Sequence, residues 1–357
     1  MSLERLRVEN FRCVERAELE VDPRCNLISG QNASGKTSLL EAVFFLGRGR
    51  SFRTARNEAL VRSGTGAFVL TGRIVAARCS QAIGMRVGQQ GIEARFAGRQ
   101  VAGLAELATL LPVQAIDPEV HRLVEGGPQE RRRYLDWGVF HVEPRFVEHW
   151  RRYQRALRQR NAALKSSQNA RAIRAWDVEL IEAGKLVNEY RVRYMECLQP
   201  AVAAAGERLL GAPIELGLNR GWSLERTLEE AIEASWLRDL ERGLTHAGPH
   251  RADVSVRFGG ATARDRVSRG QQKLAAAALL LGQLRCDAAQ GSSLAALLVD
   301  DPAAELDAGN LGRLLDEVLD LPAQLFVTAL DAGNPALRGL PSGQRFHVEH
   351  GSVTRLI

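Results

Sequence analysis

Two kinds of hydrophobic periodicity recur along the chain and predict an α/β fold. Short apolar runs, typical of buried parallel strands, occupy residues 25–28, 294–299 and 325–327. The first run leads into residues 37–46, where apolar side chains recur with the period of an amphipathic helix. Residues 67–96 alternate between apolar and polar positions and contain glycine turns, which is typical of antiparallel strands. We therefore expect a mixed central sheet accompanied by an antiparallel side sheet.

The middle of the chain has a different pattern, which predicts a helical arm. Two series of apolar residues with helical spacing cover residues 146–165 and 173–198, and a polar turn around 166–169 separates them. At 1.5 Å per residue, each helix would be roughly 30 to 40 Å long. We interpret the aromatic residues of both series, together with Trp222 and Trp236, as packing residues of the arm rather than as base-stacking platforms.

Bulk composition places the chain among globular proteins. It has 357 residues, of which 45% are hydrophobic, enough for a sizeable core. The N-terminal segment carries charges where a signal peptide needs an apolar centre, and no apolar run approaches the roughly 18 residues of a membrane span. We expect a cytoplasmic protein. The cysteines are odd in number, scattered and without a C-x-x-C pair, so reduced core thiols are expected at Cys13, Cys25, Cys79, Cys197 and Cys286.

Positive charge is concentrated in the predicted arm. The formal net charge is +6, yet residues 131–174 alone contain twelve Arg or Lys against three acidic residues. The rest of the chain is therefore slightly acidic. Two interpretations are open: a solvated helix face, or a surface that contacts phosphates, which counterion release favours. Only four lysines occur in the chain, and two of them, Lys36 and Lys273, lie in the motifs described next.

One segment fits the phosphate-loop pattern G-x-x-x-x-G-K-[ST] in full. It lies between a predicted strand and a predicted helix, which is the context this loop requires. Its residues are Gly30, Gln31, Asn32, Ala33, Ser34, Gly35, Lys36 and Thr37. Backbone N–H groups and the helix N-terminus would hold the phosphates, Lys36 would reach the β- and γ-phosphates, and the Thr37 hydroxyl would bind Mg²⁺. The motif predicts binding of ATP or a similar nucleoside triphosphate.

A metal bound at such a loop needs a carboxylate from a second strand. Asp300 and Asp301 follow the apolar run 294–299 directly. We expect Asp300 to complete the Mg²⁺ shell and Asp301 to polarise the attacking water. The strand at 325–327 ends at Thr328, another position at the carboxyl edge of a parallel sheet, where ligands collect.

The polar stretch VSRGQQK, residues 267–273, precedes an apolar helix and contains no catalytic base or nucleophile. With the phosphate loop, the acidic pair and the E-L-D of residues 305–307, it resembles the head of ATP-binding-cassette ATPases. The resemblance implies that Ser268, Arg269, Gly270 and Gln271 form the signature motif. In that family the motif caps the γ-phosphate of ATP bound to a second head, so ATP would join two copies of the chain. The competing interpretation of Ser268 is a simple helix N-cap.

Further segments narrow the resemblance to the RecF family of recombination mediators. They include LERLRVENFRCVERAELE, LPVQAIDPEVHRLVEGGPQERRRYLDWGVFHVEP, RQRNAALK, HAGPHRADV and LLVDDPAAELD, and they span almost the whole chain. The resemblance implies an ATP-dependent homodimer that binds gapped or single-strand/duplex junction DNA in the cytoplasm, at the nucleoid. It also implies work with RecR and RecO to load RecA, and slow, DNA-stimulated ATP hydrolysis as a switch, without nuclease activity.

The resemblance also assigns roles to single residues. Gln114 would sense Mg²⁺ and the γ-phosphate, or alternatively be a polar strand end. Arg12 would touch nucleotide phosphate, or alternatively form a surface ion pair. Asp307 would contact the opposite subunit, or alternatively cap a helix. Transporter-type cassettes usually have Glu where Asp301 stands and His where Thr328 stands, a departure that implies slow turnover.

The implied fold is an α/β ATP-binding-cassette head with an inserted helical arm. We expect the N-terminal part of the head at 1–115, the helical lobe at 116–245 and the C-terminal part of the head at 246–357. Alternatives are the ATPase subunit of a transporter, a short-armed chromosome-tethering ATPase, and a DNA-processing enzyme gated by ATP. The last is disfavoured because His246 and His250 flank a Gly-Pro and are expected in a loop rather than at a metal.

Overall fold

The computed structural model describes residues 1–76, 79–101, 103–166, 169–262, 268–292 and 296–356. The chain divides into two compact units. The first combines Met1–Val120 with Ser293–Ile357, and the second is His121–Ser292. The first unit is thus assembled from both ends of the chain, and the second is an insertion between them.

The central sheet of the first unit has six strands in the order β15-β14-β3-β13-β12-β8. All run parallel except β15, which pairs antiparallel with β14. The bounds are β3 (Cys25–Ser29), β8 (Val113–Ile116), β12 (Ala296–Val299), β13 (Gln324–Ala329), β14 (Gln344–Glu349) and β15 (Ser352–Leu356). Strands β3, β12 and β13 are buried along their whole length, which is why they appear in the sequence as mostly apolar runs. Residues 294 and 295 of the predicted strand lie outside the described residues.

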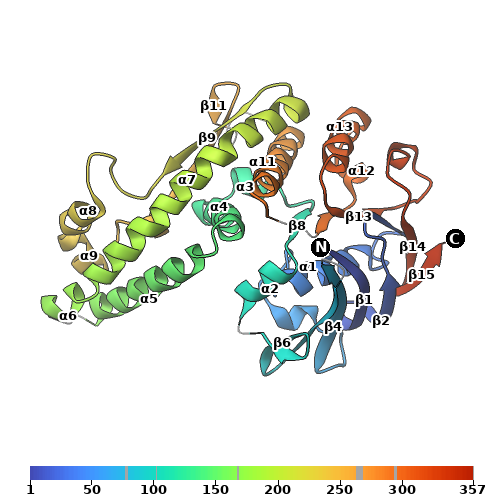
Figure 1. Ribbon diagram of the computed structural model, residues 1–357, viewed down its shortest axis with the longest axis horizontal. Coiled ribbons are helices and arrows are strands. Elements are labelled where there is room, and N and C mark those ends of the chain that lie inside the picture. The colour runs from blue at the N-terminus through green and yellow to red at the C-terminus, as the bar shows by residue number, and fades with distance from the viewer. Residues whose placement is uncertain (77–78, 102, 167–168, 263–267, 293–295, 357) are drawn as a thin grey trace. The chain divides into compact units, whose positions relative to one another are not determined.

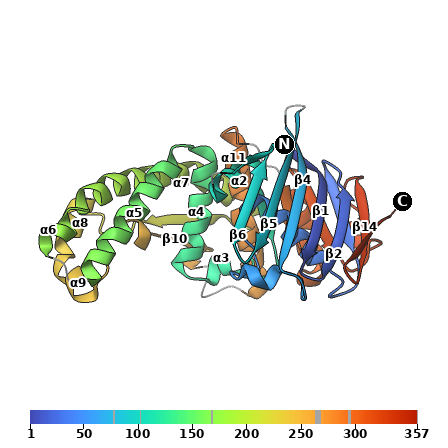
Figure 2. The same cartoon turned by 90° about the horizontal axis from the view of Figure 1, so that it is seen from below.

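The side sheet confirms the predicted antiparallel strands and extends them. Its order is β2-β1-β4-β5-β6-β7, and the five longer strands lie side by side in Figure 2. The bounds are β1 (Ser2–Phe11), β2 (Val14–Glu20), β4 (Ala67–Ala76), β5 (Cys79–Gly88), β6 (Gly91–Phe96) and β7 (Arg99–Gln100). Gln324, buried at the start of β13, exchanges two hydrogen bonds with the backbone of Leu3 in β1 (2.8 and 2.7 Å). This amide therefore fastens the side sheet to the central sheet.

Helix α1 (Lys36–Arg48) lies in the core of the first unit. Leu39, Leu40 and Phe45 are fully buried and belong to the same apolar cluster as residues of both sheets. The helix begins one residue before the predicted range and ends two residues after it. The remaining helical elements of this unit are η1 (Asn57–Leu60), α2 (Leu104–Leu110), α12 (Pro302–Glu305), α13 (Ala308–Leu319) and η3 (Pro335–Leu337).

The second unit contains the predicted arm, formed by α5 (Phe146–Lys165) and α7 (Asp177–Leu210), which lie side by side in Figure 1. A short helix, α6 (Ala170–Arg174), joins them. The second helix is longer than predicted because the buried apolar series continues beyond Leu198, through Val202 to Leu209, despite Pro200 inside the helix. At 34 residues it is roughly 50 Å long.

The boundary expected at residue 246 is corrected by the structure, because residues 246–292 belong to the helical unit. They contribute two strands to a small antiparallel sheet, and α11 packs against α7. This sheet was missed, although the alternation in DVSVRF is a strand signal. The further elements are α3 (Arg122–Glu125), α4 (Pro128–Val142), β9 (Ile214–Asn219), α8 (Leu228–Ala234), α9 (Trp236–Arg242), η2 (Pro249–Arg251), β10 (Asp253–Phe258), β11 (Ala261–Thr262) and α11 (Arg269–Ala289).

The expectation of five reduced core thiols also needs correction. Cys197 of α7 and Cys286 of α11 form a disulfide that closes 89 residues of chain. Among the free cysteines, only Cys25 is buried, whereas Cys13 and Cys79 are exposed. Sequence spacing alone could not pair cysteines that come together only when two helices pack.

Candidate nucleotide-binding site

The predicted phosphate loop joins β3 to α1 and is shaped by two glycines. Gly30 has φ +150°, and a Cβ there would lie 2.2 Å from the carbonyl oxygen of Val348. Gly35 has φ +118° and stands at the N-cap position of α1, where no side chain caps the helix. The N-terminus of this 13-residue helix is therefore open to an anion.

Lys36 is buried and folds back over the loop. Its Nζ donates to the carbonyl oxygens of Gly30 (2.7 Å) and Gln31 (2.9 Å). Within the described residues, the buried hydroxyl of Ser34 has no hydrogen-bond partner. An ammonium held at the loop, an unpartnered hydroxyl and an uncapped helix start are the groups that a triphosphate would satisfy, so the residues present fit this ligand.

A hydroxyl and a carboxylate meet at the end of the sheet, as the motifs predicted. The Thr37 Oγ1 donates to Asp300, with 3.0 Å to each carboxylate oxygen. The Thr328 Oγ1 donates to the Asp300 Oδ1 at 2.7 Å. The two groups expected to hold Mg²⁺ therefore come together from α1 and the end of β12, which fits a hydroxyl–carboxylate site for a hard cation.

Asp301 adopts a left-handed backbone conformation with φ +44°. Its backbone N–H donates to the Thr328 hydroxyl at 2.8 Å, so Thr328 connects Asp301 and Asp300. Burial raises the pKa of the Asp301 carboxyl, the Lys36 ammonium opposes this shift, and the neighbouring Asp300 adds to it. The sequence placed Thr328 at a strand end where ligands collect and in the position of a histidine; its bridging role required the positions of two strand ends.

The structure places Gln114 and Arg12, two further predicted site residues, in different surroundings. Gln114 is buried in β8 opposite Leu297 of β12, so it lies on the strand that neighbours the acidic pair.

Arg12 forms a two-pronged ion pair with Glu41 of α1, at 2.9 and 2.8 Å. Arg12 therefore forms an ion pair, but with a fully buried carboxylate rather than at the surface, and its contact with nucleotide phosphate stays a prediction. Glu41 was not predicted, because a lone acid in an apolar helix carries no signal of its partner.

The signature segment lies in the second unit, at the start of α11. Ser268 is the N-cap: its hydroxyl accepts from the Gln271 N–H at 3.3 Å, and the Gln271 side chain accepts from the Ser268 N–H at 3.1 Å. The helix begins at Arg269, and Gly270 has open space around it. Val267, the first residue of the predicted motif, lies outside the described residues. The N-cap interpretation is confirmed, and a reciprocal capping box accounts for both Ser268 and Gln271.

Asp307 is likewise an N-cap, of α13. Its carboxylate accepts from the Asn310 N–H at 2.9 Å, and this hydrogen bond lowers the pKa of the carboxyl. The charge remains available at the surface, because Asp307 is exposed.

Only part of the charge excess in the arm lies free at the surface. Several arginines have carboxylate partners, namely Arg131 with Asp253, Arg152 with Glu179, Arg160 with Asp177 and Asp239, and Arg174 with Glu233. By contrast, Arg151, Arg155 and Arg158 are exposed at successive turns of α5. Arg151 and Arg155 line a shallow depression of about 380 Å³.

Neither a further metal site nor a membrane-spanning helix is found in the described part of the chain. No group of three or more His, Cys, Asp or Glu is arranged to hold a metal there. His246 lies in the predicted loop and contacts Asp239 (2.9 Å), whereas His250 lies in the short helix η2 and contacts the Tyr153 hydroxyl (2.6 Å). Across the same residues, no helix has the length and apolar character needed to cross a bilayer.

Comparison with known proteins agrees with this geometry. The model of the RecF/RecN/SMC N-terminal domain matches residues 2–336. DNA replication and repair protein RecF of Shewanella piezotolerans is 39% identical over 357 residues, covering 99% of each chain. The RecF protein of Shewanella oneidensis is 38% identical with the same coverage. The chain belongs to the RecF family.

Solved RecF structures share the fold over the full length of this RecF family member. A structure described as the recombination mediator protein RecF–ATP in the RecFOR pathway has a TM-score of 0.89, with 26% identity, over 100% of this chain and 98% of the other. The related RecF–ATPrS structure has a TM-score of 0.88, with 25% identity and coverage of 99% and 98%. An Smc head bound to ScpA, 15% identical, has a TM-score of 0.62 over 100% and 97% of the chains and shares the fold. Membership of the RecF family sets aside the transporter alternative.

Proposed function

We propose that this chain is an ATP-switched DNA-binding protein of recombinational repair, with slow hydrolysis of ATP. The observation that carries the proposal is the meeting of Thr37 and Asp300, at 3.0 Å, beside a loop that presents Lys36 and an open helix start. This arrangement suits a triphosphate with its cation, and ATP is the nucleotide that a similar RecF structure contains.

Thr37 and Asp300 would hold Mg²⁺, with Gln114, buried in β8 opposite Leu297, as the proposed sensor. The cation neutralises phosphate charge when it is bound. Asp301, whose pKa burial raises, would accept a hydrogen bond from the water that attacks the γ-phosphate. The aspartate carboxylate is one methylene shorter than the glutamate of transporter-type cassettes, which supports slow turnover and a role as a switch.

The signature segment would act on ATP held by a second copy of the chain. Ser268, Arg269 and Gly270 are at the exposed start of α11, where N–H groups and the helix dipole favour an anion. The capping box between Ser268 and Gln271 fixes the start of this helix, and Arg269 takes no part in it. We place Asp307, exposed at the start of α13, among the contacts across the same dimer. ATP would thus hold two copies together.

DNA would bind to the closed dimer through the exposed arginines of α5. Arg151, Arg155 and Arg158 form one face, and phosphates reward such clustering through counterion release. We place gapped or single-strand/duplex junction DNA here, with RecR and RecO as partners in loading RecA. The RecFOR pathway of the similar RecF structures supports these partners, and the cytoplasm, on nucleoid DNA, is the proposed location.

The test is the solution mass of the purified chain with ATP and Mg²⁺, with ADP, and without nucleotide, each with and without gapped duplex. We expect a dimer only with ATP. Lys36→Met should bind no ATP and stay monomeric, whereas Ser268→Arg should bind ATP but stay monomeric. Ser255→Arg, which adds the same side chain at an exposed position of β10, is the control and should dimerise. If Ser268→Arg dimerises at the same ATP concentrations as the wild type, the cross-subunit role is wrong.

A further inference from the structure

Exposed leucines gather on α9, at the end of the arm where α6 and α8 also lie (Figure 1). Leu237 and Leu240 are 79% and 42% exposed, and Leu244, two residues after the helix, is 39% exposed. Residues three apart share one face of a helix, so Leu237 and Leu240 present a common apolar surface. A leucine that is four-fifths exposed contributes little to the core that folds this chain.

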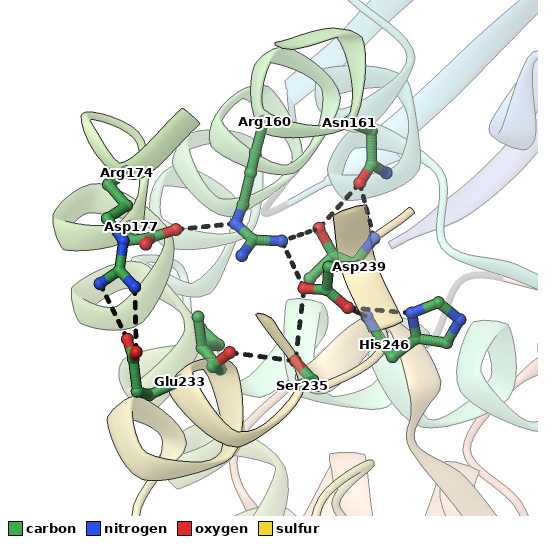
Figure 3. Close-up of polar contacts among 10 residues, drawn as sticks. Arg160, Asn161, Arg174, Asp177, Glu233, Ser235, Asp239 and His246 are labelled. Atoms are coloured by element: carbon green, nitrogen blue, oxygen red, sulfur yellow. Dashed lines mark hydrogen bonds and ion pairs between the residues drawn. The ribbon is translucent and has the colours of Figure 1, made fainter. Parts of the chain in front are cut away.

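The opposite face of α9 is held rigidly by a buried ionic network (Figure 3). Arg160 of α5 is fully buried and donates to Asp239 of α9 at 2.7 Å, to Asp177 at 2.7 Å and to Thr245 at 2.8 Å. Asp239, also fully buried, accepts from the His246 backbone N–H at 3.0 Å. The network joins α5, the start of α7, α9 and the following loop.

A second anchor lies at the start of α9. The Trp236 ring packs against a small apolar cluster that includes Leu164 and Ile173, and the Arg174 guanidinium stacks on the ring at 4.4 Å. Because two independent anchors fix the helix, the leucines form a preorganised surface, and ordering them on binding costs little conformational entropy.

Unpaired positive charge surrounds these leucines. Arg238 and Arg242 are exposed on α9, and Lys165 lies against Gly243, its Cγ 3.3 Å from where a Cβ would be. Within the described residues, none of these three cations has an ion-pair partner. Glu241 is the one exposed acid of the helix, because Asp239 is fully buried and paired with Arg160. The surface therefore combines apolar anchors with a net positive rim.

We propose that this surface, Leu237, Leu240 and Leu244 with Lys165, Arg238 and Arg242, docks an acidic amphipathic segment of a partner protein. Apolar side chains of the partner, spaced three or four residues apart, would cover the leucines, and its Asp or Glu side chains would face the basic rim. Electrostatic attraction would mainly accelerate encounter, while the leucines would slow dissociation. Nucleic acid would gain from the cations but little from an aliphatic helix face, since base stacking needs planar groups.

The test selects peptides from a random displayed library on the full-length chain, with counter-selection on the double variant Leu237→Ser/Leu240→Ser. We expect enriched peptides to contain several acids with apolar residues at i, i+3 or i+4. A synthetic copy of an enriched peptide should bind the wild type, and its affinity for the double variant should be at least tenfold lower. Its affinity for Arg238→Glu/Arg242→Glu should be lower by a similar factor. Leu224→Ser is the matched control, because Leu224 is 82% exposed but lies outside α9, and it should bind as the wild type does.

Two further measurements address other occupants of this surface. If the double variant binds fluorescein-labelled single-stranded or duplex DNA with an affinity at least tenfold below that of the wild type, the surface is a nucleic-acid site and the proposal is wrong. If sedimentation shows wild-type self-association that the double variant abolishes, the occupant is a second copy of this chain. Enriched peptides that are basic, or that bind both proteins equally, also overturn the proposal. Thermal unfolding of the double variant within about 2 °C of the wild type shows that folding is retained.

Discussion

Arg151 and Arg160 lie nine residues apart on α5 and have opposite environments. Arg151 is exposed, whereas Arg160 is fully buried and makes three hydrogen bonds to Asp177, Asp239 and Thr245. A buried arginine adds nothing to the surface potential, and its removal would leave Asp239 charged and uncompensated. At the scale of the residue, burial therefore separates the arginines that can meet phosphate from those that hold the arm together.

His250 shows the same dependence on burial. Its pKa is lowered to about 4, chiefly because the ring is removed from water, with Arg251 and Arg132 adding to the effect. Its Nδ1 lies 2.6 Å from the Tyr153 hydroxyl and its Nε2 lies 2.9 Å from the Thr245 carbonyl oxygen. A carbonyl can only accept, so Nε2 carries the proton and donates, and Nδ1 accepts from Tyr153. Because its pKa is lowered to about 4, the ring is neutral in the folded chain at pH 7, with its one proton on Nε2.

This neutral ring predicts an acid-sensitive contribution to stability. Below the ordinary histidine pKa of about 6.5, the unfolded chain binds a proton that the folded chain refuses until about pH 4. The free energy of unfolding should thus fall as the pH drops from 6.5 towards 4. Urea unfolding at pH 7 and pH 5 should show the wild type losing roughly 1 to 2 kcal/mol relative to His250→Gln, whose amide does not titrate. An unchanged difference between the two proteins would contradict the assignment.

At the scale of the element, the packing of α11 on α7 depends on Gly282. A Cβ at Gly282 would lie 2.7 Å from both the Cα and the Cγ2 of Val202. The two helices therefore approach to backbone contact at this point. Sequence reasoning found α11 through its apolar composition, but the glycine gave no indication of which helix it faces.

Gly282→Ala should destabilise the chain although alanine favours helices. The added methyl group must push α11 away from the α7 backbone, which cannot move as a side chain can, at a cost of about 2 to 3 kcal/mol. Gly312→Ala is the control, because Gly312 is exposed in α13 with open space around it. That change should be neutral or stabilise by up to about 1 kcal/mol. Thermal unfolding of both variants distinguishes close packing from helix propensity.

At the scale of the whole molecule, the proposed DNA binding depends on the positive charge of one face of the arm. The triple change of Arg151, Arg155 and Arg158 to Gln should weaken DNA binding and lower the slope of log affinity against log salt by about 3 units, near one for each phosphate contact. Arg152→Gln is the matched control on the same helix: Arg152 is already paired with Glu179 of α7, so this change should leave the slope unchanged. A triple variant with the wild-type slope would place the DNA site elsewhere.

The sequence by itself determined the local features of this protein. The phosphate loop, the acidic strand end, the signature segment and the helical arm were predicted because each depends on residues close together in the chain. The apolar periods of 2 and 3.6 also located most strands and helices, since burial of one face imposes them. Contacts between distant segments could not be predicted in this way.

Only the tertiary structure decided which distant residues meet. Thr328 joins Asp300 to the backbone of Asp301, and Glu41 holds Arg12, because strand ends and helix faces bring them together. The grouping of α11 with α7 likewise moved the expected domain boundary. Pattern along the chain reports which face of an element is buried, but the identity of the facing element depends on the packing of the whole core, and this packing decides which charges are paired and which stay exposed.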